Sequence, residues 1–258
     1  MTLLDAAHAA ISANPESEVL RLRFYERLAD GEMFLLLERE AEGDRIDPKI
    51  FALESGPVVL AFDREERLAA FSAGVAPYVA LPGRVIAGML KGQGIGFGVN
   101  LGVAPSSMLL PAEAMDWLAE ALETGPVEAE GRPESFHPPK GLPEAVLTGL
   151  DAKLARAGGL ATAALLAGVR YIGGRQGHML AFLDALPGTE TVLARAASEA
   201  LIFSGVDAGE IDVAFLRTGD PAAVTMARVA LRLDLPEPER QTGPAAPGTD
   251  PATPPRLR

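Results

Sequence analysis

The chain has 258 residues, of which 48% are hydrophobic, 22% are charged and none is cysteine. This composition predicts a soluble globular protein of two domains, and the missing cysteine excludes disulfides, thiol nucleophiles and cysteine-ligated metals. The net charge is −12, with nine more acids than bases in residues 1–125, which argues against nucleic acid and anionic membranes as partners.

The first part of the chain predicts helices followed by short strands. Asn14-Pro15-Glu16 is typical of a helix start, with Asn as the cap and Pro at the first helical position, and Gly31 ends that helix. Asp63, with Glu66 three residues later, predicts the capped start of a further helix. Strands are expected at residues 33–39, 57–62, 77–82 and 94–101, and helices at residues 84–90 and from Pro111 onward.

Residues 125–141 are rich in proline and glycine and predict a linker between two separable domains, 1–124 and 142–235. The second domain is expected to hold helices opened by Pro143, from Thr189 and from Pro221. It is also expected to hold strands at residues 161–172, 178–186 and 211–217, the first two joined by a hairpin turn through Gly173 and Gly174. Residues 236–258 contain seven prolines and one large aliphatic residue, which predicts a disordered tail.

Strands and helices alternate along the chain but also pair as hairpins. This pattern favours an α+β class over a doubly wound sheet, with two small domains that are each a mixed sheet with packed helices. No internal repeat relates the two halves.

The glycine-rich stretch from Gly92 to Gly102 does not match a nucleotide-binding motif. The sixth residue from Gly92, Gly94 or Gly96 is never glycine, and no Lys-Ser or Lys-Thr pair follows. Alternation predicts instead a strand with Ile95, Phe97, Val99 and Leu101 on one face and Gly94, Gly96, Gly98 and Asn100 on the other. The glycine face either packs against a helix of the same domain or forms an interaction surface for a partner.

No catalytic or metal-binding set is recognisable. The three histidines are His8, His137 and His178. They are not spaced like the ligands of a metal site and have no carboxylate residues placed to accompany them, so no cofactor is expected. Ser106 and Ser107 are expected to bond backbone groups in a turn, because no nucleophile elbow surrounds them. Arg170 and Arg175 are expected to be exposed beside the hairpin turn.

Most of the chain before the tail resembles the SseB family, the bacterial enhanced serine sensitivity family. The resemblance rests on residues 78–83, the glycine strand, Asn100-Leu101-Gly102, residues 108–111 and the helix of Trp117. The family usually has Asn-Pro-Gly where this chain has Asn100-Leu101-Gly102. The resemblance implies a small α+β N-terminal domain followed by an SseB-like C-terminal domain, and it implies no catalytic residue or cofactor.

We therefore expect a cytoplasmic protein that acts by binding a protein or ligand, without catalysis. The segment before Asn14 has no basic residue, which is unlike a signal peptide. The alternative is an enzyme of small-molecule or amino-acid metabolism, with a carboxylate-based site between the domains. The sequence identifies neither the partner nor the oligomeric state.

Overall fold

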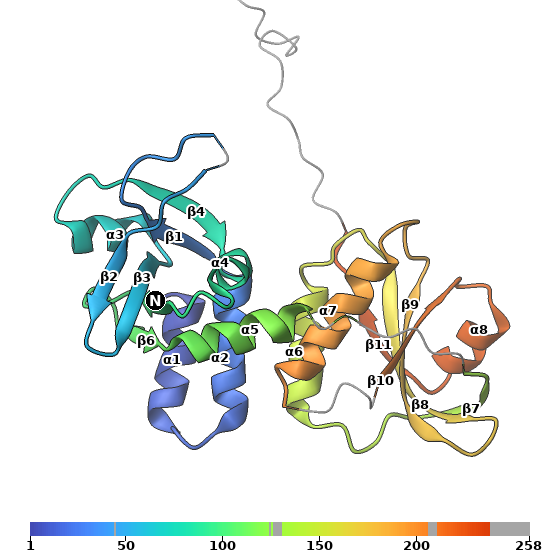
Figure 1. Cartoon of the computed structure of the whole chain (residues 1–258). Coiled ribbons are helices and arrows are strands. Elements are labelled where there is room, and N and C mark those ends of the chain that lie inside the picture. The colour runs from blue at the N-terminus through green and yellow to red at the C-terminus, as the bar shows by residue number, and fades with distance from the viewer. Residues whose placement is uncertain (44, 124, 126–130, 206–210, 238–258) are drawn as a thin grey trace, which may run out of the picture.

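The structure is a computed structural model of the chain, and it describes residues 1–43, 45–123, 125, 131–205 and 211–237. In this part of the chain, helices pack against two separate mixed sheets (Figure 1), so the expected α+β class is confirmed. Most of the predicted tail, from residue 238 onward, lies outside the described residues. None of the described helices has both the length and the apolar character needed to span a bilayer.

The first sheet has the strand order β4-β1-β3-β5-β6, and β2 pairs with β3. Strands β3 and β5 run parallel, and the other neighbouring strands are antiparallel. The strands of this sheet are β1 (Glu32–Leu36), β2 (Ile50–Leu53), β3 (Gly56–Phe62), β4 (Tyr78–Pro82), β5 (Gly96–Val99) and β6 (Met108–Leu110).

The side chains of β3 point alternately to the two faces of the first sheet. The first unit, which is this sheet with its helices, therefore has one hydrophobic core on each face. Val59 and Ala61 enter the larger core, whereas Val58 and Leu60 enter the smaller one, because successive side chains of a strand point to opposite faces. The larger core is closed by helices α1 (Leu3–Ala13), α2 (Glu18–Asp30), α4 (Gly83–Leu90) and α5 (Ala112–Glu123), and the smaller one by α3 (Glu65–Ser72).

The second sheet has the order β10-β9-β8-β11, with β7 paired with β8, and it also carries a core on each face. Ala164 and Leu166 of β8 face one core, whereas Ala163 and Leu165 face the other. The first of these cores is closed by α6 (Glu144–Leu154) and α7 (Glu190–Ile202), and the second by α8 (Pro221–Ala227). The strands are β7 (Pro133–His137), β8 (Ala163–Tyr171), β9 (Gln176–Leu183), β10 (Ile211–Leu216) and β11 (Leu231–Asp234).

Three local expectations differ from the structure. Asn14 does not open a helix but ends α1, and Ser17 caps α2 by accepting a bond from the Leu20 amide. Asp63 does not cap α3, because Arg67 and Thr2 bind its carboxylate instead. Within the expected linker at residues 125–141, β7 extends the second sheet by pairing with β8, so that part of the range is not a free connector.

The two units contact each other through α7. Its C-cap, Phe203, is 3% exposed and belongs to the larger core of the first unit, where it lies edge-on to Trp117 at 6.5 Å between ring centroids. An aromatic side chain of the second unit is therefore buried in the first, which ties the two together.

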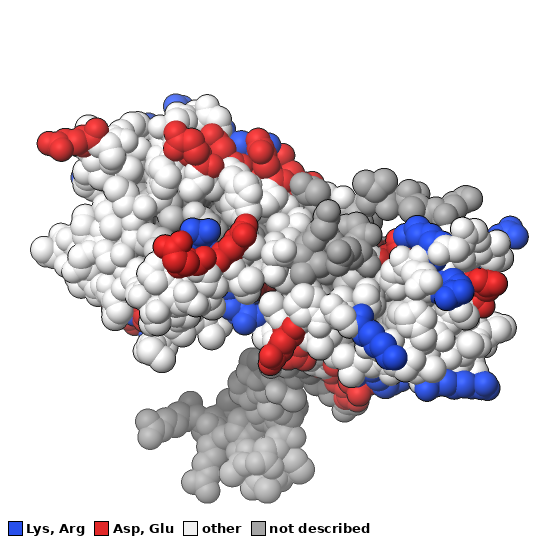
Figure 2. All heavy atoms as spheres, turned by 90° about the horizontal axis from the view of Figure 1, so that it is seen from below, with Lys and Arg blue, Asp and Glu red and all other residues white. Residues whose placement is uncertain are grey.

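Charge is unevenly distributed over the two units. Figure 2, seen from below, shows acidic side chains in clusters over the first unit at left, whereas Lys and Arg lie mainly over the second unit at right. The picture agrees with the surplus of nine acids in residues 1–125.

Candidate functional site

The glycine strand is not an open surface. Gly96, Gly98 and Asn100, three of the four residues expected to form an interaction face, are buried, and only Gly94 is exposed. Gly94 precedes β5 and has φ +66, a left-handed conformation that glycine adopts without strain. The observed strand is also shorter than the expected 94–101, because the chain turns at Asn100, which has φ 50.

The neighbours of these glycines explain their burial. A Cβ atom at Gly96 would lie 2.7 Å from the carbonyl oxygen of Leu110, and one at Gly98 would lie 2.5 Å from Cδ2 of Leu60. The face is therefore filled by the same domain, although by a neighbouring strand end and core side chains and not by the helix we expected. A pocket of about 270 Å³ remains at its edge, lined by Gly94, Gly96 and residues of β3, β6 and the start of α5.

Asn100 belongs to a buried polar network that the sequence did not reveal. Its Nδ2 donates to Ser106 Oγ at 2.9 Å, and Ser106 Oγ donates to Asp5 Oδ1 at 2.6 Å. Arg67 also binds Asp5, and its hydrogen bond holds the pKa of that carboxyl well below its usual range. Ser106 thus connects side chains and not the turn backbone, whereas Ser107 does accept a bond from the Gly102 amide.

The other polar residues singled out from the sequence are dispersed. His8 packs edge-on against Phe24, while His137 and His178 contact the backbone carbonyls of Pro138 and Lys140. Arg175 is exposed and pairs with Asp212. Within the described ranges, no group of three His, Asp or Glu residues could hold a metal ion.

A cluster of charged side chains lies where the two units meet. Lys153 of α6 is 6% exposed, and its Nζ lies 2.8 Å from both Asp30 Oδ2 and Glu199 Oε2. Arg84 of α4 binds the same two carboxylates, at 2.9 Å for Glu199. We call Glu26, Asp30, Arg84, Lys153, Arg156 and Glu199 the interdomain charge cluster.

The carboxyl groups of this cluster differ in their environments. Burial alone would raise the pKa of Asp30 and Glu199, but the charges and hydrogen bonds of Lys153 and Arg84 leave both below their ordinary values. Glu26 is 3.9 Å from Lys153 Nζ, and burial outweighs this attraction and raises its pKa. Three carboxylates do meet between the domains, as the enzyme alternative requires, but Asp30 is bound by three cations and Glu199 by two.

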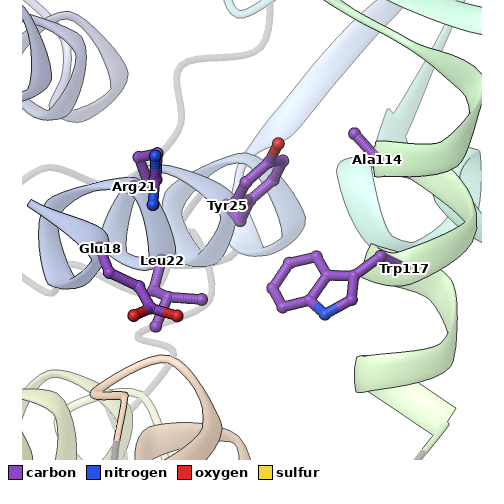
Figure 3. Close-up of a pocket in the computed structure, with 6 residues that line it drawn as sticks. All are labelled: Glu18, Arg21, Leu22, Tyr25, Ala114 and Trp117. Atoms are coloured by element: carbon purple, nitrogen blue, oxygen red, sulfur yellow. The ribbon is translucent and has the colours of Figure 1, made fainter. Parts of the chain in front are cut away.

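A second open pocket, of about 180 Å³, lies between α2 and α5, next to the domain junction. Figure 3 shows Leu22 and Tyr25 of α2 pointing toward Ala114 and Trp117 of α5. The Tyr25 and Trp117 rings lie 5.2 Å apart between centroids. We call this the Tyr25–Trp117 pocket, and it is lined by Glu18, Arg21, Leu22, Tyr25, Ala114 and Trp117.

Trp117 is unusual for a tryptophan in an amphipathic helix. The buried stripe of α5 consists of Met115, Leu118, Ala119 and Leu122, and Trp117 lies beside it with 38% of its surface exposed. Its position outside the apolar stripe is the sequence signal that could have identified Trp117 as a candidate binding residue. Its ring lines the pocket together with Tyr25, and tryptophan and tyrosine are enriched at surfaces that bind other molecules.

The Tyr25–Trp117 pocket retains free hydrogen-bonding capacity. Within the described part of the chain, neither Trp117 Nε1 nor Tyr25 Oη makes a hydrogen bond, and partial burial raises the pKa of the Tyr25 hydroxyl. Indole N–H and phenol O–H groups usually find partners when they are covered. An apolar floor with two free donors is suited to an extended peptide, whose carbonyl groups need donors.

Compared with protein-family models, curated protein sequences and solved structures, the chain matches none.

Proposed function

We propose that this chain is a cytoplasmic, non-catalytic binding protein of the SseB family, and that its Tyr25–Trp117 pocket binds a peptide segment of a partner protein. The resemblance to the family includes the helix of Trp117, which is α5. That helix supplies one wall of the pocket.

The observation that carries the proposal is that the exposed Trp117 faces Tyr25. Trp117 Nε1 and Tyr25 Oη make no hydrogen bond within the described part of the protein. Tryptophan and tyrosine are enriched at binding hot spots, and here both line the same open pocket. The acidic first unit also favours a partner segment with basic residues, since charge complementarity speeds association.

The enzyme alternative has less support. A carboxylate that acts as acid or base needs access to a substrate, and Asp30 and Glu199 are instead bound by Lys153 and Arg84. Neither of the two pockets described above is lined by a member of the interdomain charge cluster. This arrangement favours a structural role for these carboxylates.

The proposal can be tested by blocking the pocket without removing packed atoms. The full chain with Ala114→Arg would be immobilised beside the wild type, and proteins retained from the native cytoplasmic extract would be compared at native abundance. Ala114 lines the pocket and is only partly buried, although it also packs against the edge of the larger core, so an arginine there has room to extend into the opening.

The matched control is Ala70→Arg, the same substitution at an exposed position of α3, on the opposite side of the first sheet. A partner lost with Ala114→Arg and kept with Ala70→Arg supports the proposal. Equal retention by all three proteins, or no specific retention by the wild type, contradicts it. Circular dichroism of each variant checks that the fold is unchanged.

A further inference from the structure

One side of α2 faces the second unit. Leu22, Glu26 and Asp30 are spaced four residues apart, so they follow one another along the same side of the helix. Leu22 is buried but is not part of the larger core of the first unit, and a Cβ atom at Gly205, beyond the end of α7, would lie 3.5 Å from its Cδ1. Lys153 of α6 binds Asp30 at 2.8 Å. Glu26 lies between these two contacts with its side chain 3% exposed, so the second unit covers it.

Glu26 is the carboxyl group of the interdomain charge cluster that is held least closely. Lys153 Nζ lies 2.8 Å from one oxygen of each of the other two carboxylates but 3.9 Å from Glu26 Oε1, which exceeds the length of a hydrogen bond. The arginines of the cluster also bind the other two carboxylates. The charged groups that surround Glu26, directly or through these contacts, are Arg23, Arg27 and Asp30 of its own helix, Lys153 and Arg156 of α6, Arg84 of α4 and Glu199 of α7.

This environment favours the neutral form of Glu26. Burial raises the pKa of its carboxyl group, although the charge of Lys153 acts in the opposite direction. If the two units separate, Glu26 returns to water and its carboxyl group regains ordinary behaviour. A group that binds a proton more tightly in the docked state than in the open state couples docking to pH.

We propose that Glu26 takes up a proton from solvent when the two units dock and releases it when they separate, so that their junction is a pH-sensitive latch. The ratio of open to docked molecules then rises with pH, by up to about tenfold for each pH unit above the ordinary glutamate range, until the docked carboxyl group itself ionises. Asp30 and Glu199 oppose this only in the acid range, because docking is lost as the pH falls through their lowered pKa values.

The latch also supports the Tyr25–Trp117 pocket. Two of the residues that line the pocket contact the end of α7, since Leu22 lies next to Gly205 and Trp117 lies edge-on to Phe203. Opening of the junction removes both contacts, so we expect the pocket to bind its peptide more weakly when the latch is open. This consequence rests on the proposed function, whereas the latch itself does not.

The composition of the chain allows docking to be measured directly. The chain has no cysteine, so Ala70→Cys and Val224→Cys in the full chain take one fluorescent dye each. Both positions are exposed, on α3 of the first unit and α8 of the second, which lie on opposite sides in Figure 1. Energy transfer between the dyes in single molecules then resolves docked and open molecules as two populations. A second series carries Phe203→Ala, which weakens the apolar part of the junction and raises the open population.

Glu26→Gln and a matched control decide the outcome. We expect the open-to-docked ratio to rise several-fold between about pH 5 and pH 8 in the wild-type background and in Glu16→Gln, and to stay constant in Glu26→Gln. A ratio that does not change with pH in the wild-type background would overturn the latch. The same rise in Glu26→Gln, or a single docked population at every pH in both series, would also overturn it. Circular dichroism checks that each variant is folded.

The partner assay keeps this inference apart from the proposed function. At about pH 8, Glu26→Gln should retain more of the partner than the wild type, because its junction stays docked. Retention that depends on Ala114 but is equal in these two proteins overturns the link between the latch and the pocket and leaves the proposed function standing. Retention that is insensitive to Ala114→Arg overturns the proposed function, while the dye measurement still decides whether the latch exists.

Discussion

At the scale of single residues, Gly96 shows how closely the first sheet is packed. Its missing side chain lets the Leu110 carbonyl approach the backbone of β5, and Val58 fills the space beside it. Close approach of another backbone is one of the reasons why glycine occurs inside strands. The glycine is therefore required by packing and not by an external ligand.

We predict that Gly96→Val lowers the free energy of unfolding by about 1–3 kcal/mol, because its Cβ would overlap a backbone oxygen that cannot move freely. Gly88→Ala in α4 is the control, since nothing lies within 4 Å of a Cβ there. Alanine is the better helix former, so this variant should gain up to about 1 kcal/mol. Urea unfolding followed by circular dichroism measures both, and equal stabilities for the two variants would contradict this account.

At the scale of elements, the interdomain charge cluster joins α2 and α4 of the first unit to α6 and α7 of the second. Its geometry is reciprocal, because Asp30 and Glu199 each bind both Lys153 and Arg84. Burying charges is unfavourable unless they are paired, so removing one partner leaves the others uncompensated.

Lys153→Met should lower the free energy of unfolding by about 3–5 kcal/mol, because the methionine keeps the apolar stem but leaves buried carboxylates without their cation. Lys91→Met is the matched control, as the Lys91 ion pair with Glu123 lies at the surface. It should change stability little. Thermal unfolding of the two variants at neutral pH gives the comparison, and a similar melting temperature for both would refute a structural role of the cluster.

Glu26 gives the cluster an expected pH dependence. Its pKa is raised by burial, with Lys153, Arg27 and Arg23 acting in the opposite direction and Asp30 reinforcing the shift. A carboxyl with a raised pKa destabilises the native state once the pH exceeds its unfolded value, because the buried group must then ionise. Asp30 and Glu199 have lowered pKa values and contribute the opposite dependence in the acid range.

We therefore expect Glu26→Gln to be more stable than the wild type at pH 7, with the difference vanishing below about pH 4, where the unfolded carboxyl is also protonated. Glu16→Gln, at an exposed position before α2, is the control and should show no such dependence. Urea unfolding at several pH values measures the effect. A Glu26→Gln variant that is less stable at pH 7 would show that the ion pair with Lys153 dominates instead.

At the scale of the whole molecule, the structure changes the expectation that the two domains are separable. Phe203 lies in the core of the first unit, Lys153 of the second unit binds Asp30 of the first, and β7 ties part of the expected linker into the second sheet. The two units therefore share an interface with an apolar part and a charged part, and not merely a covalent connection.

A protease cut between residues 125 and 131 should thus leave two fragments that stay together. We expect them to elute as one species in size-exclusion chromatography at neutral pH, although a denaturing gel shows two bands. The same cut in Lys153→Met combined with Phe203→Ala should release separate fragments. Wild-type fragments that separate without denaturant would restore the expectation of independent domains.

Much of the fold could be predicted from local pattern. The apolar periods of α5, β3 and β8, the proline starts of α6 and α8 and the glycine turn between β8 and β9 each act within a few residues, so the sequence determined these elements. Short edge strands were missed. β2, β6, β7 and β11 have three to five residues each, and their pairing partners stabilise them more than their own composition does.

The sites were decided by tertiary structure. The cysteine-free composition, the acidic first unit and the off-stripe position of Trp117 are properties of the sequence alone. The facing of Tyr25 and Trp117 and the meeting of Lys153 with Asp30 depend on how helices 92 and 123 residues apart in the chain pack together. Side-chain contacts at such separations are fixed by the packing of whole elements, which no local periodicity encodes.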